Sequence, residues 1–155
     1  MVLISAGTKE DCRWELPDDL YYHKKDHIWA RVEGNLVRMG LDAFGQWAAG
    51  TLAQMRTFPA GRAIRKGHAF GNLESGKFIG PMRSPVSGKI LEVNTEVVAN
   101  PSMVNEDNYG NWIVLVEPSS LEEDLADLPS GETAIQEWMA AELQEFKDKD
   151  LLNCD

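Results

Sequence analysis

Residues 66–94 read KGHAFGNLESGKFIGPMRSPVSGKILEVN, and this stretch decides the fold. Its short apolar runs alternate with Gly, Ser and Pro, the residues that end strands and form turns. We expect one strand over residues 69–74 and a partner strand over residues 78–82. Gly76 and Lys77 separate the two runs by the spacing of a tight β-hairpin, which predicts that Lys77 lies at the hairpin tip.

The chain on both sides of this stretch is punctuated in the same way. Further strands are expected at residues 27–32, 36–41, 51–58, 63–65, 86–94 and 112–116. A short helix is expected over residues 42–49, with Asp42 as its N-cap and Gly50 as its end. About eight short, closely spaced strands predict a mainly β protein of the sandwich or barrel class.

The last quarter of the chain has a different pattern, which predicts a helical hairpin broken at residues 129–131. Ser120 and Glu123 have the spacing of a capping box. After the break, one apolar stripe with helical spacing is expected to pack on the sheet: Ile135, Trp138, Met139, Leu143 and Phe146. The solvent side of that helix is expected to carry Glu132, Glu137, Glu142 and Glu145.

These patterns divide the chain into four parts. Residues 1–19 form a loosely held N-terminal arm, residues 20–118 the β domain, residues 119–147 helices packed on it, and residues 148–155 a frayed tail. Cys12 and Cys154 are expected to be two free thiols, because two cysteines are too few for a disulfide scaffold or a Cys-based metal site.

The composition is that of an acidic globular protein of 155 residues with 15 Lys and Arg against 25 Asp and Glu, a formal net charge of −10. That charge argues against nucleic acid and anionic membranes as partners, since both need a basic face. We find no signal or transit peptide and no stretch of transmembrane length. We therefore expect a cytoplasmic protein. We also expect a monomer, because the negative net charge disfavours self-association.

The motifs of common enzyme classes are missing from the sequence. It contains no GxSxG, HExxH, CxxC, GxGxxG or P-loop pattern. His23 and His27 flank a strand, where their spacing does not converge on a metal, so we expect neither a metal site nor catalytic residues. Lys77 is the candidate functional residue, since a flexible lysine at a hairpin tip suits an amine that another enzyme acylates. By itself this signal is weak, because an exposed turn lysine is more often a solvated charge.

The residues around Lys77 resemble the glycine cleavage H protein family, which has the lipoyl and biotinyl carrier fold. The similarity extends over about residues 20–146. The family pattern G-x-x-F-G-x-x-E-S-x-K is matched by Gly67, Phe70, Gly71, Glu74, Ser75 and Lys77, and is followed by a second pattern over residues 84–94. Further matches are His27, Trp29, Gly40, Leu41, Gln46, Gly50, Pro101, Val104, Asn105, Gly110 and Trp112.

The resemblance implies a flattened β-barrel, or barrel-sandwich hybrid, with short terminal helices. It also implies lipoate in amide linkage on Lys77, with Glu74, Ser75, Gly76 and Phe78 as the hairpin context that a lipoate-attaching enzyme meets. Such a protein is a cofactor carrier acted on by partner enzymes and is not itself an enzyme. We expect Gly76 to permit turn dihedrals that other residues resist.

The chain departs from the family pattern beside the lysine. Typical members have Val and Ala where this chain has Gly76 and Phe78, Gly80-Pro81 follows, and Phe44 stands where many have His or Tyr. In these departures the sequence resembles the lipoate-binding proteins of bacterial sulfur oxidation. Their lipoyl arm shuttles a sulfur-containing intermediate, with a heterodisulfide-reductase-like complex and a lipoamide dehydrogenase as partners.

Several functions stay open on these residues. An ordinary glycine cleavage H protein would carry an aminomethyl group between glycine decarboxylase, aminomethyltransferase and lipoamide dehydrogenase. The residues are also compatible with another lipoyl relay, with an interaction module without lipoate, and with an enzyme that uses a histidine or a thiol. In a sulfur carrier, Cys12 or Cys154 would also be a candidate for exchange with the lipoyl disulfide.

Overall fold

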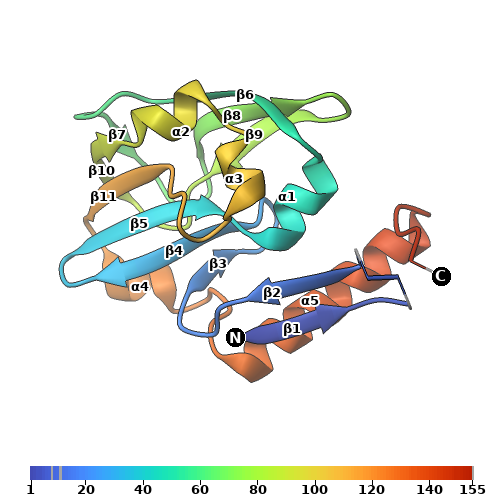
Figure 1. Ribbon diagram of the computed structural model, residues 1–155. Helices are drawn as coiled ribbons and strands as arrows, with labels where there is room; N and C mark the ends of the chain where they lie inside the picture. Colours follow the sequence, from blue (N-terminus) through green and yellow to red (C-terminus); the bar gives the residue numbers. More distant parts are fainter. Residues whose placement is uncertain (8, 11, 155) are drawn as a thin grey trace.

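The structure is a computed structural model that describes residues 1–7, 9–10 and 12–154. It is mainly β with short helices, as the sequence predicts, and a longer helix near the C-terminus (Figure 1). The elements in chain order are β1 (Val2–Ser5), β2 (Arg13–Leu16), β3 (Tyr21–His23), β4 (Ile28–Glu33), β5 (Leu36–Leu41), α1 (Ala43–Ala49), β6 (Leu52–Thr57), β7 (Ala63–Ile64), β8 (Ala69–Ser75), β9 (Ile79–Arg83), β10 (Gly88–Val93), α2 (Thr95–Ala99), α3 (Met103–Glu106), β11 (Val114–Pro118), α4 (Leu121–Leu125) and α5 (Glu132–Asp148).

Two antiparallel sheets face each other across the main core. One has six strands in the order β3-β4-β5-β11-β10-β7, and the other has three strands in the order β6-β8-β9. Figure 1 shows β6, β8 and β9 lying above the strands of the larger sheet, so that the two sheets enclose a common interior. The expected flattened barrel-sandwich architecture is therefore present. Buried side chains from both sheets meet there, among them Ile28, Val37, Met39, Phe70, Met82, Ile90 and Val116.

A second layer, which we call the terminal layer, covers the outer face of the larger sheet. It consists of the β1-β2 hairpin and α5, which lie side by side in Figure 1. Both faces of strand β4 are apolar because each face lies in a different core. Ile28 and Ala30 point into the main core, whereas Trp29 points into a second core beneath the terminal layer. The expected apolar stripe of α5 also packs there, with Ile135, Trp138 and Met139 buried.

The N-terminal segment is not the loosely held arm that we expected. Strands β1 and β2 pair antiparallel from Val2↔Leu16 to Ser5↔Arg13. Their alternate side chains are buried in the second core, including Val2, Trp14 and Leu16. The alternation was too short to be recognised in the sequence, and its burial depends on α5, far away along the chain.

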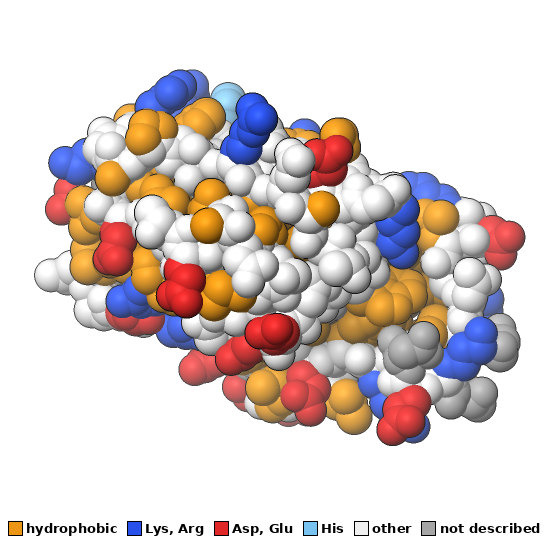
Figure 2. All heavy atoms as spheres, turned by 45° about the horizontal axis from the view of Figure 1, so that its top comes forward, with side chains coloured by type: hydrophobic (Ala, Val, Ile, Leu, Met, Phe, Trp, Pro, Cys, Tyr) orange, Lys and Arg blue, Asp and Glu red, His pale blue; other side chains and the backbone are white. Residues whose placement is uncertain are grey.

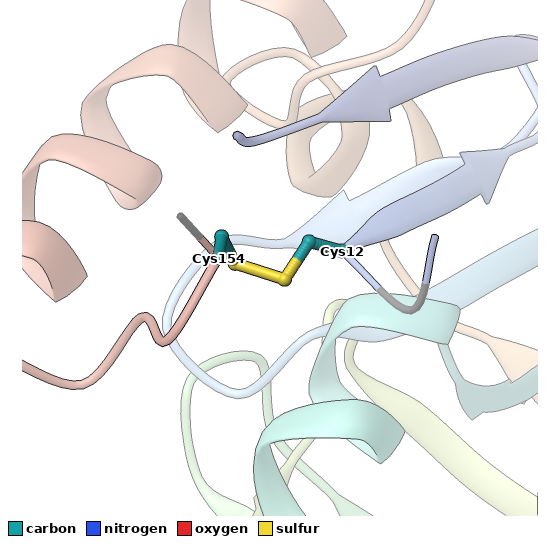
Figure 3. The surroundings of a disulfide bond; sticks show 2 residues. All are labelled: Cys12 and Cys154. Atoms are coloured by element: carbon teal, nitrogen blue, oxygen red, sulfur yellow. A yellow bond between two sulfur atoms is a disulfide. The ribbon is translucent and has the colours of Figure 1, made fainter. Parts of the chain in front are cut away.

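A disulfide joins the two ends of the terminal layer and corrects two further expectations. Cys12 and Cys154 are bonded, with 5.8 Å between their Cα atoms, and both are buried. Figure 3 shows the bond linking the segment after α5 to the start of β2. The cysteines are therefore not free thiols, and the described part of the tail is tied down rather than frayed. No local pattern indicates this pairing, since 142 residues separate the two cysteines.

Local signals in the sequence had mixed outcomes. Asp42 caps α1 as expected, because its Oδ1 accepts a hydrogen bond from the Gly45 amide at 2.8 Å. The expected capping box before α4 is wrong, since the Ser120 side chain makes no cap hydrogen bond. Strand β3 and helices α2 and α3 were not expected, because each is shorter than the pattern that identifies such elements.

The division of the chain at residues 19/20 and 118/119 stays a prediction. Within the ranges that the structure describes, no helix is long and apolar enough to cross a membrane.

We predict that the disulfide stabilises the fold by closing a very long loop. Replacing both cysteines (Cys12→Ser with Cys154→Ser) should lower the free energy of unfolding by about 2–4 kcal/mol. Denaturant unfolding of the unmodified protein with and without reductant measures this. Reductant should destabilise the wild type and leave the double variant unchanged, and equal responses of the two proteins would contradict the prediction.

Candidate functional site

Lys77 lies at the tip of the β8-β9 hairpin. The two strands pair from Glu74↔Ile79 back to Ala69↔Arg83. The Ser75 amide donates a hydrogen bond to the Phe78 carbonyl at 2.8 Å and closes the turn. Gly76 and Lys77 are the two residues that remain at the tip, and both are exposed.

The Ser75 hydroxyl holds the backbone of this tip. Ser75 is buried, and its Oγ accepts hydrogen bonds from the amides of Lys77 at 3.3 Å and Phe78 at 3.1 Å. The same hydroxyl donates to the carbonyl of Ala49, the last residue of α1. One side chain therefore fixes the turn and attaches it to the end of a helix, so the tip is exposed but its backbone is held.

Gly50 lies directly under the Lys77 side chain. Its φ is 89°, in the left-handed region that favours glycine, and a Cβ at this position would lie 3.1 Å from Cε of Lys77. Asn105 of α3 secures this segment, donating from Nδ2 to the Gly50 carbonyl and accepting at Oδ1 from the Leu52 amide, both at 3.1 Å. The absence of a side chain at Gly50 therefore leaves room for the lysine methylenes.

Gly76 does not have the role that we expected. Its φ is not in the left-handed region, and a Cβ there would meet nothing within 4 Å. The glycine that the hairpin needs is Gly71, because a Cβ on it would lie 2.1 Å from the backbone oxygen of Arg56 in β6, whereas a Cβ on Gly80 would meet only the movable Phe78 ring. The Phe78 ring folds back over Gly80, and 43% of the Phe78 residue remains exposed.

A cleft of about 800 Å³ opens beside the hairpin. Phe78, Ile79 and residues 80–83 line one side of it, and Trp138, Phe146 and other residues of α5 line the opposite side. The turn between β3 and β4, the end of α1 and the segment after α5 also contribute to its lining. Figure 2 shows hydrophobic side chains in the recess between the barrel and the terminal layer, while charged side chains of both signs are scattered over the rest of this face.

His27 connects three elements at the wall of this cleft. Its Nδ1 donates to Oδ2 of Asp42 at 2.8 Å, and its Nε2 donates to Oε1 of Glu142 on α5 at 2.7 Å. The ring stacks on Trp138 with a centroid distance of 4.9 Å. Glu142 is therefore not on the solvent side of α5 as we expected. No helical pattern reveals this, because its partner is more than a hundred residues away.

The charge of His27 follows from these two carboxylates. Burial alone lowers the pKa of His27, but the Asp42 carboxylate and the hydrogen bonds to Asp42 and Glu142 outweigh burial and raise it to about 9. The side chain is thus an imidazolium at neutral pH. It forms an ion-paired bridge that holds α5, and with it one side of the cleft, against the barrel.

The sequence-predicted residues come together only in part. Ser75, Gly76, Lys77 and Phe78 form the tip, whereas Glu74 lies one step back in β8, opposite Gln54 and Ile79. The sequence predicts neither the cleft nor the bridge from His27 to Glu142. For His27 and for Gly50, the only signal in the sequence was that each residue matches the family pattern.

The chain is similar to known proteins of one family. The family model described as "Glycine cleavage H-protein" matches residues 20–141. Glycine cleavage system H protein 2 of Aquifex aeolicus is 37% identical over 141 residues, covering 90% of this chain and 84% of its own. Glycine cleavage system H protein 3 of the same organism is 43% identical over 127 residues, covering 79% of each chain.

Solved structures give the same result. The crystal structure of a glycine cleavage system H protein from Mycobacterium marinum superimposes with a TM-score of 0.63 at 32% identity. The match covers 67% of this chain and 87% of that one. The fold of the barrel is thus shared with a protein of known structure.

We predict that the bridge weakens at alkaline pH. Because folding raises the pKa of His27 from 6.5 to about 9, its contribution is fully present below pH 6.5 and is lost as the pH rises through about 9. The free energy of unfolding should fall by about 2 kcal/mol between pH 7 and about 9.5. Measurements stop there because burial also raises the pKa values of Tyr22 and Tyr109, which adds a second loss above pH 10.

Variants assign this loss to the bridge. Glu142→Gln should move the fall to lower pH, and His27→Gln should remove it. His68→Gln changes an exposed histidine and should behave like the wild type. An unchanged pH profile in both bridge variants would show that His27 does not hold α5 by its charge.

Proposed function

Because the chain belongs to the glycine cleavage H-protein family, we propose that Lys77 carries its lipoyl group in amide linkage. Members of this family are lipoyl carriers and not enzymes themselves. The observation that supports Lys77 is its place at the tip of a hairpin whose backbone the Ser75 hydroxyl fixes from below. An attaching enzyme would meet a mobile amine on an immobile turn.

The residues around Lys77 fit a lipoyl arm. Gly50 leaves space along the lysine methylenes, and the cleft beside the tip is lined by apolar residues of the hairpin and α5. When bound, lipoate supplies a cyclic disulfide that can be reduced to a dithiol and can carry a fragment on sulfur. The chain's own part is to fix the root of the arm, to offer apolar surface to its methylenes and to limit access of water. Acylation of Lys77 removes one positive charge and takes the formal net charge from −10 to −11.

We propose that four residues surround the attachment site and that each has a different role there: Glu74, Ser75, Gly76 and Phe78. Ser75 positions the turn, Phe78 covers Gly80, and Gly76 is the exposed residue next to the lysine at the tip. Glu74 is half-buried in β8, where its carboxylate lies close enough to the tip to be met by an attaching enzyme.

For the cargo, family membership favours the aminomethyl group of glycine cleavage. The partners would then be glycine decarboxylase, aminomethyltransferase and lipoamide dehydrogenase, besides the lipoate-attaching enzyme. The charge of the carrier suits such a cycle, since an acidic monomer is steered towards basic docking sites and repelled from its own copies.

A second candidate cargo is a sulfur-containing intermediate of a heterodisulfide-reductase-like pathway. One structural feature favours it. The bulky Phe78 ring lies over Gly80 at the mouth of the cleft, and typical family members have the small residue Ala at the position of Phe78. The assay that separates the two candidates is glycine-dependent release of CO₂ by glycine decarboxylase with the lipoylated protein. Turnover would support the first candidate, and its absence with a competent decarboxylase would favour the second.

We predict that Lys77→Arg abolishes lipoylation without loss of the fold. The unmodified protein, incubated with a lipoate ligase, lipoate and ATP, should gain one lipoyl increment on the peptide that contains residues 74–78. Lys89 is a matched control, since it is also exposed and follows a glycine in a strand of the barrel. Lys89→Arg should be modified like the wild type, and lipoate on the Lys77→Arg protein would disprove the assignment.

A further inference from the structure

A smaller pocket opens beside the disulfide, on the face of α5 opposite to the cleft. It has a volume of about 210 Å³ and is lined by α5, by the segment after α5 and by the two residues that follow β1. Cys154 lines this pocket, whereas Cys12 is not among the described residues that do. The disulfide is mostly buried, but one of its two cysteines therefore faces an opening to solvent.

Lys147 gives this pocket its charge. It is the one charged side chain among the described residues that line the pocket, and it has no ion-pair partner in the part of the chain that the structure describes. Most of the other lining residues are small or apolar, such as Ala140, Leu143 and Leu152. The thiolate is the reactive form of a thiol in disulfide exchange, and a lysine favours it by its charge. The pocket thus suits the approach of a thiolate to Cys154.

The chain beyond α5 depends on the disulfide for its position. Hydrogen bonds hold it as far as Leu151, whose amide donates to the Phe146 carbonyl at 2.8 Å. Just before this, Asp150 has a φ of 56°, in the left-handed region that residues with a Cβ rarely adopt. Residues 152–154 make no hydrogen bond with any other residue that the structure describes. The disulfide and the burial of two side chains therefore hold this end of the chain.

The same segment also reaches the cleft beside the hairpin. Lys149 and Leu151 belong to the lining of that cleft, and both precede Cys154 by only a few residues. If the disulfide opens, the end of the segment loses its covalent attachment to the start of β2 (Figure 3). The redox state of the bond is thereby linked to one end of the cleft.

We propose that the pocket beside Cys154 is a site of thiol–disulfide exchange, at which a thiol-bearing reductant attacks Sγ of Cys154 and releases the segment after α5. The attacking thiolate forms a new S–S bond with Cys154. The Cys12–Cys154 bond breaks, and its electron pair leaves with the Cys12 sulfur, which takes up a proton from water. The second thiol of a dithiol reductant then displaces Cys154, so that the reductant becomes a disulfide and both cysteines become thiols. None of these steps requires lipoate on Lys77.

Glutathione shows which sulfur is attacked. The oxidised protein without lipoate is incubated with glutathione, the reaction is stopped at intervals with excess N-ethylmaleimide, and the peptides are analysed by mass spectrometry. The expected product carries glutathione on Cys154 and N-ethylmaleimide on Cys12. Glutathione on Cys12 in an equal or greater amount would overturn the inference.

Two matched pairs of variants test the pocket itself. Ala140 lines the pocket and its neighbour Ala141 lines the cleft, and both are exposed on α5. Ala140→Phe should fill the pocket and slow the reaction with glutathione several-fold, whereas Ala141→Phe should react like the wild type. Lys147→Gln should also slow the reaction, by a factor that shrinks in high salt, whereas Lys149→Gln removes the same charge outside the pocket and should not. Equal rates within both pairs would overturn the role of the pocket.

Amide hydrogen exchange tests the release of the segment. After complete reduction with dihydrolipoamide, the Leu151 amide should exchange several-fold faster, while the amides of β8 and β9 keep their protection. Unchanged protection of Leu151, or an equal loss of protection in β8 and β9, would overturn the release. Because all of these experiments use the protein without lipoate, their failure is distinct from failure of the proposed function, which is decided by lipoylation of Lys77.

Discussion

The site depends on the three hydrogen bonds of one buried hydroxyl, that of Ser75. A carrier needs an amine that is mobile at its end and fixed at its root, two demands that a free loop cannot meet together. The hydroxyl meets them by accepting from two amides of the turn and donating to the last carbonyl of α1. Without it the tip would leave buried polar groups unpaired and would lose its attachment to the helix.

The terminal layer forms one side of the cleft, and the barrel forms the other. The residues that match the family model end at 141, within α5 and before Glu142, Phe146 and the disulfide-bonded tail. Two contacts hold this wall in place: the imidazolium bridge from His27 to Glu142, and the bond from Cys12 to Cys154. Both join segments from opposite ends of the chain, so the shape of the cleft depends on the termini as much as on the barrel.

The sequence predicted what local pattern determines. The tight turn at Gly76-Lys77, the N-cap Asp42 and the apolar stripe of α5 are encoded within a few residues, and the structure contains them. The Cys12–Cys154 pair and the burial of Glu142 are decided by which distant segments meet, and no spacing reveals that. Gly76 shows the same limit, because the sequence does not reveal that its φ lies outside the left-handed region and that a Cβ there would meet nothing within 4 Å.

Both candidate cargoes require the attachment at Lys77. The most direct measurement is intact and peptide mass spectrometry of the protein isolated from its native cells. The account predicts one lipoyl increment on the peptide containing residues 74–78, and any further mass on that peptide would identify the cargo. A bare Lys77 in cells that lipoylate other proteins would contradict the account and leave the family resemblance as one of fold alone.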